Sequence, residues 1–511
     1  MMIQHLFPSV ALHEISIDPS ALKEVPARIA SHYPLLPVGW EEGRLKIAMP
    51  FSIDVGIVDE VGVILNREVV VVLAPEEDIK KAIKRHYGIG ADTLERLVDD
   101  ANTEIAPISH ASDALHDLEA DQEASVTKFV NQMLLEAYQN RATDIHIEPY
   151  QDDLRVRYRI DGVLYETKIS DSLKRFQSAI TSRIKIMADL SIAEKRLPQD
   201  GRIIVRVEGQ EMDLRVSTLP TPFGESIGIR LLTGQQFLDL PYLGFAPHDL
   251  KRLESYLHKP HGIIFLTGPT GSGKTTTLYA FLKQINQTDK KIITLEDPIE
   301  YQMKGITQVQ VQPKINLTFG AGLRAMLRHD PDVMMVGEVR DFETAEIAIR
   351  VSLTGHLVFS TLHTNDAPGA VTRLEDIGVE PYLISSSVLC IIAQRLVRLI
   401  CEGCKTETML PREFRSEFGL SDQDPDVPVF FGKGCEACKN TGFHGRTVIY
   451  EMLPITPGIQ ELIVKRAPAN VIRDKALQEG MQTLRQCGWN KIRAGLTTAQ
   501  EVIRATLQEG I

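Results

Sequence analysis

Short runs of apolar residues alternate with longer segments of helical periodicity in the second half of the chain. From about Pro241, four such runs have the length and content of buried strands, at residues 262–267, 291–295, 333–336 and 357–360. Strands that alternate with helices favour a parallel sheet with helices on both faces. The pattern predicts an α/β, doubly wound core, which is the architecture expected around a nucleotide.

Two smaller α+β modules are predicted before this core. Residues 20–88 alternate helix, strand, helix, strand and helix, with a turn at Glu41–Gly43. The second module, 124–233, begins with an amphipathic helix and continues through strands such as 154–160, followed by the turn Asp161-Gly162. Between the modules, residues 99–123 contain eight acidic residues and no lysine or arginine, which is typical of a solvated linker. We detect no internal repeat.

The composition excludes several classes of protein. Among 511 residues, 56 lysines and arginines stand against 68 acidic residues, so the net charge is −12. This is the wrong sign for a surface that follows nucleic acid phosphates, and no nucleic acid partner is expected. No run approaches the roughly 18 apolar residues of a transmembrane helix. The N-terminus lacks the cationic start and cleavage site of a secretory signal, so we expect a cytoplasmic protein.

The strongest chemical signal is the segment GPTGSGKT at residues 268–275, which matches G-x-x-x-x-G-K-[ST]. In such a loop, backbone N–H groups cradle phosphate oxygens, while Lys274 neutralises terminal phosphate charge and the Thr275 hydroxyl reaches Mg²⁺. The loop follows a strand and precedes a helix, whose positive N-terminal end faces the phosphates. The predicted ligand is a nucleoside triphosphate, bound by Gly268, Thr270, Gly271, Ser272, Gly273, Lys274, Thr275 and Thr276.

A P-loop enzyme also needs carboxylates near Mg²⁺ and the attacking water, usually at the ends of neighbouring strands. The segment TLEDPIEY, 294–301, ends a strand with Glu296, Asp297 and Glu300, and PDVMMVGEVRD, 331–341, ends one at Glu338. Any one such carboxylate is more often an ordinary capping or surface residue. A third segment, GHLVFSTLHTN at 355–365, changes that balance.

Two histidines bracket the strand of this third segment. His356 and His363 could sense or stabilise the γ-phosphate, although a structural role for each alone is as well supported. Taken together, the three segments favour a catalytic set.

The set GPTGSGKT, TLEDPIE, RHDPDVMMVGEVRD and STLHTND resembles the Walker A, Asp box, Walker B and His box of the secretion ATPase superfamily, and in particular the type II secretion ATPase (GspE) family. The resemblance covers the chain from about residue 124 onward. It implies a RecA-like ATP hydrolase with Glu300 as the general base that positions water, Glu338 holding Mg²⁺ through its shell, and His363 facing the γ-phosphate. Gly337 replaces the usual Walker B aspartate, which is typical of the superfamily and leaves Glu338 as the only carboxylate at that strand end.

Arginines are candidates for stabilising transition-state charge. Arg215 and Arg230, in the strands DLRVST and IGIRLL of the second module, match the arginine fingers of the resembled family; a salt-bridged strand arginine is the alternative. Arg324 and Arg328 are spaced four apart on one helix face, as candidates for a subunit interface. The family works as a ring of six subunits, so the resemblance implies a homohexamer.

Four of the six cysteines form two C-x-x-C pairs, Cys401 with Cys404 and Cys435 with Cys438, separated by thirty residues. Four thiolates suit a closed, structural Zn²⁺ site, and free thiols are the alternative. Cys390 and Cys487 are expected to be buried, small apolar residues. The resembled secretion and pilus-extension ATPases carry this insert and the retraction ATPases lack it, which argues against retraction.

These signals divide the chain into six segments. They are an N-terminal α+β partner-docking domain (1–90), an acidic linker (91–123), a second α+β domain with the arginine fingers (124–236), the P-loop ATPase core (237–395), the four-cysteine insert (396–450) and a helical C-terminal segment (451–511).

The preferred function is ATP hydrolysis that powers protein export through the type II secretion system by driving pseudopilus assembly. The N-terminal domain would dock on the cytoplasmic domain of an inner-membrane protein of that system, so membrane contact runs through this partner on the cytoplasmic face. The alternative is a type IV pilus assembly ATPase, which shares every motif. A nucleic-acid translocase is disfavoured by the acidic charge, and a scaffold without turnover by the joint presence of Lys274, Glu300, Glu338 and the finger arginines.

Overall fold

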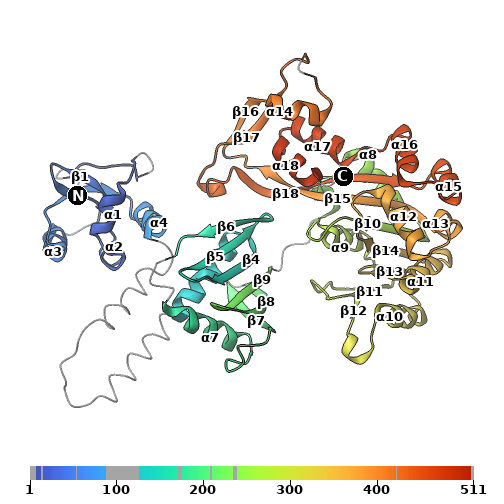
Figure 1. Ribbon diagram of the computed structural model, residues 1–511, viewed down its shortest axis with the longest axis horizontal. Coiled ribbons are helices and arrows are strands. Elements are labelled where there is room, and N and C mark those ends of the chain that lie inside the picture. The colour runs from blue at the N-terminus through green and yellow to red at the C-terminus, as the bar shows by residue number, and fades with distance from the viewer. Residues whose placement is uncertain are drawn as a thin grey trace. The chain divides into compact units, whose positions relative to one another are not determined.

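The computed structural model describes residues 7–12, 15–52, 55–87, 126–169, 175–207, 210–233, 239–421 and 423–507, and the acidic linker expected at 91–123 lies outside them. The chain divides into two compact units, residues 1–234 and 235–511, coloured from blue to green and from green to red in Figure 1. Over the described part of the chain, every helix is too short or too polar to cross a membrane.

The N-terminal module is a three-stranded sheet with helices packed on it. Its elements are α1 (Pro19–Glu24), α2 (Ala27–His32), β1 (Leu36–Glu41), β2 (Arg44–Pro50), α3 (Val55–Leu65), β3 (Val69–Ala74) and α4 (Glu76–Tyr87). β1 and β2 form an antiparallel hairpin, and β3 pairs in parallel with β2. The predicted turn joins β1 to β2 with left-handed φ angles of 50° at Glu42 and 81° at Gly43, which suit the twist of a hairpin.

The second module is a six-stranded antiparallel sheet. Its elements are a helix over 126–139, β4 (Ala142–Pro149), β5 (Leu154–Ile160), β6 (Val163–Thr167), α7 (Gln177–Met187), β7 (Gln199–Val207), β8 (Gln210–Thr221) and β9 (Gly224–Thr233). The strand order is β6-β5-β4-β9-β8-β7. Alternate residues such as Leu214, Val216 and Ile229 join the apolar core with the two helices, so the residues between them project from the opposite face.

The core of the second unit is a seven-stranded sheet. Its elements before the cysteine lobe are η4 (Leu240–Leu243), α8 (Pro247–Leu257), β10 (Gly262–Thr267), α9 (Lys274–Ile285), β11 (Ile292–Glu296), β12 (Thr307–Gln310), η5 (Pro313–Ile315), α10 (Phe319–Met326), η6 (Leu327–His329), β13 (Val333–Val336), α11 (Phe342–Leu353), β14 (Leu357–Leu362), α12 (Ala367–Ile377), α13 (Pro381–Ser387) and β15 (Val388–Ile400). The remaining elements are β16 (Lys405–Met409), α14 (Arg412–Arg415), η7 (Ser416–Phe418), β17 (Pro428–Gly432), η8 (Glu436–Cys438), β18 (Phe443–Pro454), α15 (Pro457–Val464), α16 (Ala469–Gln478), α17 (Leu484–Arg493) and α18 (Ala499–Thr506).

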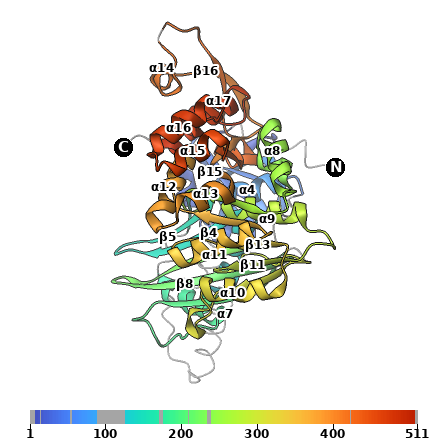
Figure 2. The ribbon, with the colours of Figure 1, turned by 90° about the vertical axis from the view of Figure 1, so that its right-hand side faces the viewer.

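The strands of this sheet lie in the order β12-β11-β13-β14-β10-β15-β18, and every neighbouring pair is parallel except β15 and β18. Strand β10 is buried on both faces, with Ile264 and Leu266 in one core cluster and Ile263 and Phe265 in the other. Helices α8, α9, α17 and α18 contribute to the first cluster and α10 to α13, α15 and α16 to the second. Figure 2 shows α11, α12 and α13 on the sheet. The predicted α/β core is confirmed, with an antiparallel edge strand that was not predicted.

The cysteine-bearing lobe is inserted between the two long strands β15 and β18. These strands pair from Cys390 opposite Pro454 to Ile400 opposite Phe443. Residues 396–400 and 443–450, which the sequence analysis assigned to the insert, therefore lie in the main sheet, and the lobe itself spans 401–442. It contains the two-stranded sheet of β16 and β17.

Candidate functional site

The loop at residues 268–275 joins the end of β10 to the start of α9. Its three glycines have positive φ angles, 145° at Gly268, 80° at Gly271 and 87° at Gly273. A Cβ added to Gly268 would lie 2.6 Å from the carbonyl oxygen of Gln394 and 2.7 Å from Oγ of Ser272. Glycine is therefore required at this position by both conformation and space. The backbone can turn its N–H groups toward an anion at the N-terminus of α9.

Lys274 is folded back over this loop. Its Nζ donates hydrogen bonds to the carbonyl oxygens of Gly268 (2.7 Å) and Pro269 (3.1 Å). Burial, and then the positive charge of Arg395, lower the pKa of Lys274 to about 8, although Glu338 acts in the opposite direction. An ammonium group held among carbonyls and beside a second cation is suited to an anionic ligand, because the added negative charge favours its protonated form.

The hydroxyl groups of the loop divide into a buried and an exposed set. Ser272 is 3% exposed, and its Oγ has no hydrogen-bond partner among the described residues. Thr270, Thr275 and Thr276 are exposed. A glycine cradle with an unpartnered buried hydroxyl and exposed threonines at the start of a helix fits a nucleotide polyphosphate with Mg²⁺ on Thr275.

Glu338 and His363 come together at the same edge of the sheet. They follow the ends of the neighbouring strands β13 and β14, and His363 Nε2 lies 3.2 Å from Glu338 Oε2. The other carboxylate oxygen lies 2.8 Å from Nε of Arg340. Preceding Glu338, Gly337 is closely packed, since an added Cβ would lie 3.3 Å from the Leu295 carbonyl oxygen. This gives a physical reason for glycine where an aspartate is more usual.

The carboxylates after β11 have different environments. Glu296 is 3% exposed and accepts hydrogen bonds from Tyr279, Thr294 (2.6 Å) and Gln308 (3.1 Å), so it is occupied in holding the core. Asp297 is exposed, and Glu300 is half-buried in the turn that follows. The backbone N–H of Glu300 donates to the Tyr279 hydroxyl at 3.4 Å. Glu300 thus follows the strand end at the same edge as Lys274 and Glu338, because β10, β11 and β13 run in parallel.

Of the two roles left open for His356, its contacts support the structural one. Its carbonyl oxygen accepts a hydrogen bond from the N–H of Gly262, the first residue of β10, and its Nδ1 lies 3.2 Å from the Val351 carbonyl oxygen. His356 therefore lies at the edge of the sheet opposite to the phosphate loop, one strand length away, which is roughly 20 Å for six residues. It has a structural role at the end of α11.

Two residues at this site were missed by the sequence analysis. Gln394 donates from Nε2 to the Ser272 carbonyl oxygen at 2.8 Å, and Arg395 donates from Nη2 to the Asn365 carbonyl oxygen at 2.8 Å. Both are buried, at 0% and 5% exposed. The available signal was a polar pair in the apolar run VLCIIAQRLV, because a buried strand rarely carries a glutamine and an arginine without a reason.

Arg215 and Arg230 lie side by side in the second module. They are directly opposite each other on β8 and β9, on the face away from the helices. Arg230 Nε lies 3.1 Å from Asp144 Oδ1, and Arg159 Nε lies 3.7 Å from the other oxygen of that carboxylate. With 61% of its side chain exposed, Arg230 can reach other groups at little cost. The structure thus brings the two candidate fingers together in one row.

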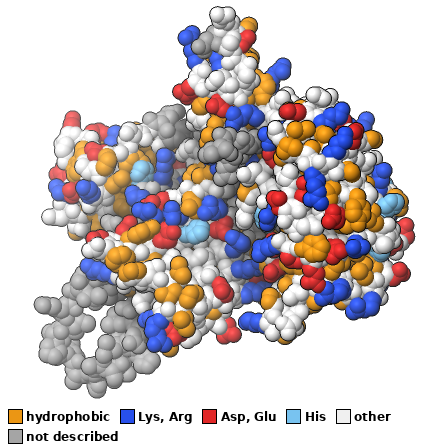
Figure 3. Space-filling model, turned by 45° about the vertical axis from the view of Figure 1, so that its right-hand side comes forward, with side chains coloured by type: hydrophobic (Ala, Val, Ile, Leu, Met, Phe, Trp, Pro, Cys, Tyr) orange, Lys and Arg blue, Asp and Glu red, His pale blue; other side chains and the backbone are white. Residues whose placement is uncertain are grey.

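Arg324 and Arg328 lie near the end of α10 and in η6. Arg324 forms an ion pair with Glu343 of α11, and Arg328 donates to the Arg324 carbonyl oxygen at 3.0 Å. The ion pair joins α10 to α11, and a role at a subunit interface stays a prediction. Over the face drawn in Figure 3, basic and acidic side chains are interspersed rather than gathered in one patch.

The four cysteines of the two C-x-x-C pairs converge at the base of the lobe. Their sulfurs all lie within 4.8 Å of one another, with separations of 3.8 Å for Cys401 and Cys435 and 3.8 Å for Cys404 and Cys438. Sulfurs at about 2.3 Å from a tetrahedral Zn²⁺ are roughly 3.8 Å apart, so the arrangement fits this ion.

Backbone N–H groups in this cluster point at sulfur. Gly434 donates to Cys404 at 3.3 Å, and Cys435 and Gly442 donate to Cys438 at 3.2 and 3.3 Å. Burial raises the pKa of Cys438, but hydrogen bonds from the Cys435 and Gly442 N–H groups and from the neighbouring thiols bring it to about 6, whereas burial raises the pKa of Cys401 and Cys404. Donors to sulfur favour the thiolate form that a metal needs. The expectation that Cys390 and Cys487 are buried is confirmed, at 0% and 6% exposed.

Comparison with known proteins places this geometry in a family. The sequence model described as type II/IV secretion system protein matches residues 119–504. The chain belongs to the type II/IV secretion ATPase family. A second model, the MshEN domain, matches residues 5–93. The resemblance inferred from the motifs is confirmed.

Individual relatives of this secretion ATPase cover most of its length. It is 42% identical over 512 residues to the type IV pilus assembly ATPase PilB of Myxococcus xanthus, covering 98% of this chain and 89% of that protein. It is 45% identical over 447 residues to the type II secretion system protein E of Dickeya dadantii, covering 86% and 87%. The structure of the ATPase DotB of Legionella pneumophila is 21% identical, with a TM-score of 0.54 and coverage of 75% and 96%. This last likeness concerns the fold alone.

Family membership supports ATP hydrolysis at the phosphate loop, with ATP and Mg²⁺ as its ligands. The predicted RecA-like core with a parallel sheet, a four-cysteine cluster and a helical C-terminus is likewise confirmed.

Proposed function

We propose that this secretion ATPase hydrolyses ATP to power protein export through a type II secretion system by driving pseudopilus assembly. The observation that carries the proposal is the convergence of Lys274, Glu338 and His363 at one edge of the sheet, in a chain 45% identical to a type II secretion system protein E. The site supports the motor activity, and the type II secretion relatives support the secretion pathway.

Each residue of the site has a chemical role in this proposal. When bound, Mg²⁺ neutralises charge on the β- and γ-phosphates. Lys274 binds the terminal phosphates, and Thr275 and Glu338 hold the ion, Glu338 through its water shell. Glu300 orients the attacking water and accepts its proton, and His363 faces the γ-phosphate. Glu338, at the ion site, lies 3.2 Å from His363, at the γ-phosphate, so the two parts of the site are in direct contact.

Arg215 and Arg230 supply the positive charge that the transition state needs, from the second module of the same or a neighbouring subunit. Fingers supplied by a module separate from the core would couple hydrolysis to movement of that module. The working assembly is a homohexamer. The N-terminal module, 1–90, docks on the cytoplasmic domain of an inner-membrane protein of the system, which places the chain on the cytoplasmic face of that membrane.

The cysteine cluster holds Zn²⁺ as a structural ion in this proposal. Four sulfurs leave no open ligand position for substrate, and the lobe lies beyond the strands that carry the phosphate loop. Its contribution is to fix the base of the lobe. Nucleic acid is not a partner, in keeping with the net charge of −12.

A second candidate is a type IV pilus assembly ATPase. The relative from Myxococcus xanthus bears that name and matches 98% of this chain, including the N-terminal module. The catalytic residues serve both functions equally, so only the pathway separates them.

The catalytic part is tested by ATP hydrolysis of the purified chain, alone and fused to a hexameric carrier, with Lys274→Ala and Arg215→Ala variants. We expect activity that rises on assembly and is lost in both variants. An assembled form that binds ATP and does not hydrolyse it would refute the motor and favour a scaffold.

The pathway is tested by deleting the gene in its source bacterium and measuring secreted enzymes and surface pili separately. Loss of secretion with intact pili supports the first proposal, and the reverse supports the pilus ATPase. Complementation with Glu338→Gln separates catalysis from a scaffolding role, because that variant keeps the fold and removes the carboxylate charge.

A further inference from the structure

Strand β15 extends past the end of the strand that carries the phosphate loop. The last residue of β10, Thr267, pairs with Ala393, so Gln394 and Arg395 are the first residues of β15 beyond that pairing. They lie beside the loop where it leaves the sheet. The position is set by the register, which shifts by one residue at Leu389 because Ile263 pairs with Val388 and Ile264 with Cys390.

The pair contacts both ends of the phosphate loop. Gln394 Nε2 donates to the Ser272 carbonyl oxygen at 2.8 Å, near the start of α9. At the other end, an added Cβ on Gly268 would lie 3.1 Å from Nη1 of Arg395. The guanidinium thus packs directly against the first glycine of the loop.

Arg395 also contacts the segment that carries His363. Its Nη2 donates to the carbonyl oxygen of Asn365 at 2.8 Å, and its Nη1 donates to the Gln394 carbonyl oxygen at 3.1 Å. Arg395 is only 5% exposed. Its charge-assisted hydrogen bonds are therefore shielded from water, and this makes them stronger. A single buried side chain therefore spans the phosphate loop and the loop after β14.

We propose that Arg395 is a positioning residue of the nucleotide site, holding the His363 segment against the phosphate loop so that the γ-phosphate is sensed. This inference rests on the proposed function, in which His363 faces the γ-phosphate. Loss of the guanidinium fork loosens the 363–365 segment at Asn365, although the hydrogen bonds between Thr364 and Thr267 remain. Contacts to the γ-phosphate weaken more than contacts to the α- and β-phosphates, so the preference for ATP over ADP falls.

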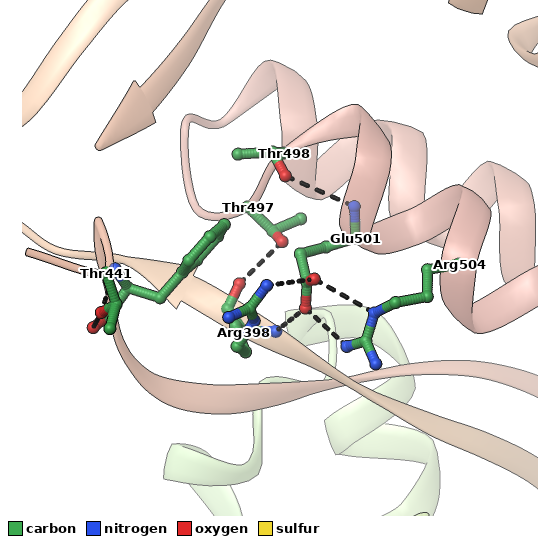
Figure 4. Close-up of polar contacts among 7 residues, drawn as sticks. Arg398, Thr441, Thr497, Thr498, Glu501 and Arg504 are labelled. Carbon is green, nitrogen blue, oxygen red and sulfur yellow. Dashed lines mark hydrogen bonds and ion pairs between the residues drawn. The ribbon is translucent and has the colours of Figure 1, made fainter. Parts of the chain in front are cut away.

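The same strand offers a matched control in Arg398. Its Nη2 lies 2.8 Å from Oε1 of Glu501, a carboxylate with a 3% exposed side chain that also binds Arg504, and its guanidinium stacks on Phe443 at 3.9 Å. Figure 4 shows this network between β15 and α18. Arg398→Gln also removes a guanidinium from β15, but the described contacts of this side chain are with α18 and β18. The variant therefore measures how far a general disturbance of β15 affects stability and nucleotide binding.

The experiment measures binding of Mg²⁺ with AMPPNP, a non-hydrolysable ATP analogue, and of Mg²⁺ with ADP to the full chain by isothermal titration calorimetry. The readout is the ratio of the two Kd values, with thermal unfolding recorded in parallel. In Arg395→Gln we expect the affinity for AMPPNP to fall roughly tenfold more than the affinity for ADP. Arg398→Gln should lower the unfolding temperature and leave the ratio unchanged.

A conservative variant and a double variant sharpen the test. Arg395→Lys keeps the charge and loses the planar fork, so it should change the ratio as Arg395→Gln does. His363→Ala should abolish the effect of Arg395→Gln, because both act through one contact. The inference would be overturned if either Arg395 variant kept the wild-type ratio of Kd values, or if the effects of Arg395→Gln and His363→Ala on that ratio were fully additive. Neither outcome would affect the proposed function, provided that the wild type binds both nucleotides. A wild-type chain that binds neither nucleotide would overturn the proposed function, and this inference with it.

Discussion

Nε2 of His363 lies 3.2 Å from Oε2 of Glu338 and so joins the ends of the neighbouring strands β14 and β13. Glu338 is the more enclosed of the two, with 15% of its side chain exposed against 44% for His363. The imidazole therefore lies toward the open side of the site, with the carboxylate behind it. Changes at Glu338 are expected to reach the γ-phosphate contact through this hydrogen bond.

Replacing Glu338 by glutamine should abolish hydrolysis and spare nucleotide binding. Glutamine keeps the size of the side chain and a hydrogen bond to His363, but it lacks the negative charge that balances Mg²⁺ and Lys274. We expect kcat of the hexameric form to fall by at least about 100-fold. The Kd for AMPPNP with Mg²⁺ should change much less.

Glu346→Gln is the matched control for this substitution. Glu346 pairs with Arg350 on the surface of α11, four residues away on the same helix, and such pairs contribute little to stability. Its variant should keep wild-type turnover. A Glu338→Gln enzyme that retains a tenth or more of the wild-type rate would contradict the role given to this carboxylate.

Nucleotide affinity should fall as the pH rises through about 8, because that is the pKa of Lys274 in the free site. Only the protonated amine of Lys274 neutralises phosphate, and in the free site the neutral amine predominates above about pH 8. Bound polyphosphate raises the pKa of Lys274 again. Affinity is therefore lost as the pH rises from the pKa of the free site to the pKa of the complex. At pH 9 the Kd should be about tenfold higher than at pH 7.

Calorimetry in buffers of different ionisation enthalpy checks this directly. Binding near pH 8 should take up protons, and proton uptake should be absent in Lys274→Ala. Equal proton uptake in the variant would assign the titration to another group.

Much of the core fold was predictable because its central strands are buried on both faces. The predicted runs at 262–267 and 333–336 coincide with β10 and β13, and 291–295 differs from β11 by one residue. By contrast, β15 and β18 were not predicted as sheet strands. Gln394, Arg395 and Arg398 interrupt the apolar run of β15, and their partners come from segments that are distant in the sequence.

The site was predictable where chemistry is local in sequence. The loop around Lys274 and the strand end at Glu338 are each encoded by one short segment. The two histidines lie at opposite edges of the sheet, because His356 precedes the parallel strand β14 and His363 follows it. The contact of Arg395 with the phosphate loop depends on the register of two strands, which spacing alone does not define.

Gly268→Ala should disrupt the phosphate loop far more than Gly271→Ala. Both residues have positive φ, so each alanine carries a backbone cost of roughly 1–2 kcal/mol. The Cβ at 268 would also lie 2.6 Å from a backbone oxygen of β15, whereas the one at 271 meets nothing within 4 Å. We expect loss of measurable AMPPNP binding in the first variant and a change of a few fold in the second. Similar losses in both would show that conformation, not space, limits the loop.

Cys401→Ser should release zinc and disorder the lobe while leaving the nucleotide site intact. The sulfur of Cys401 lies 3.8 Å from that of Cys435, within a set that holds the two ends of the lobe together. The sheet of β16 and β17 has only two strands, and such a sheet is marginal alone. Val429 packs in the core cluster with α17, and the four sulfurs fix the two ends of the lobe. The phosphate loop follows β10 and contacts β15, and both strands precede Cys401. The described contacts of the loop do not involve the lobe.

The measurements are zinc content by mass spectrometry, proteolysis within 401–442 and the Kd for AMPPNP. The wild type should hold about one zinc ion per chain, and Cys401→Ser or treatment with a strong chelator should remove it and expose the lobe to cleavage. Cys487→Ser is the control, because this buried cysteine lies in the core cluster with α17 and should keep zinc while losing some stability. Zinc retained by Cys401→Ser would show that the ion does not depend on this sulfur. An intact lobe after zinc removal would show that its order comes from its packing on α17, where Phe418 stacks on Trp489.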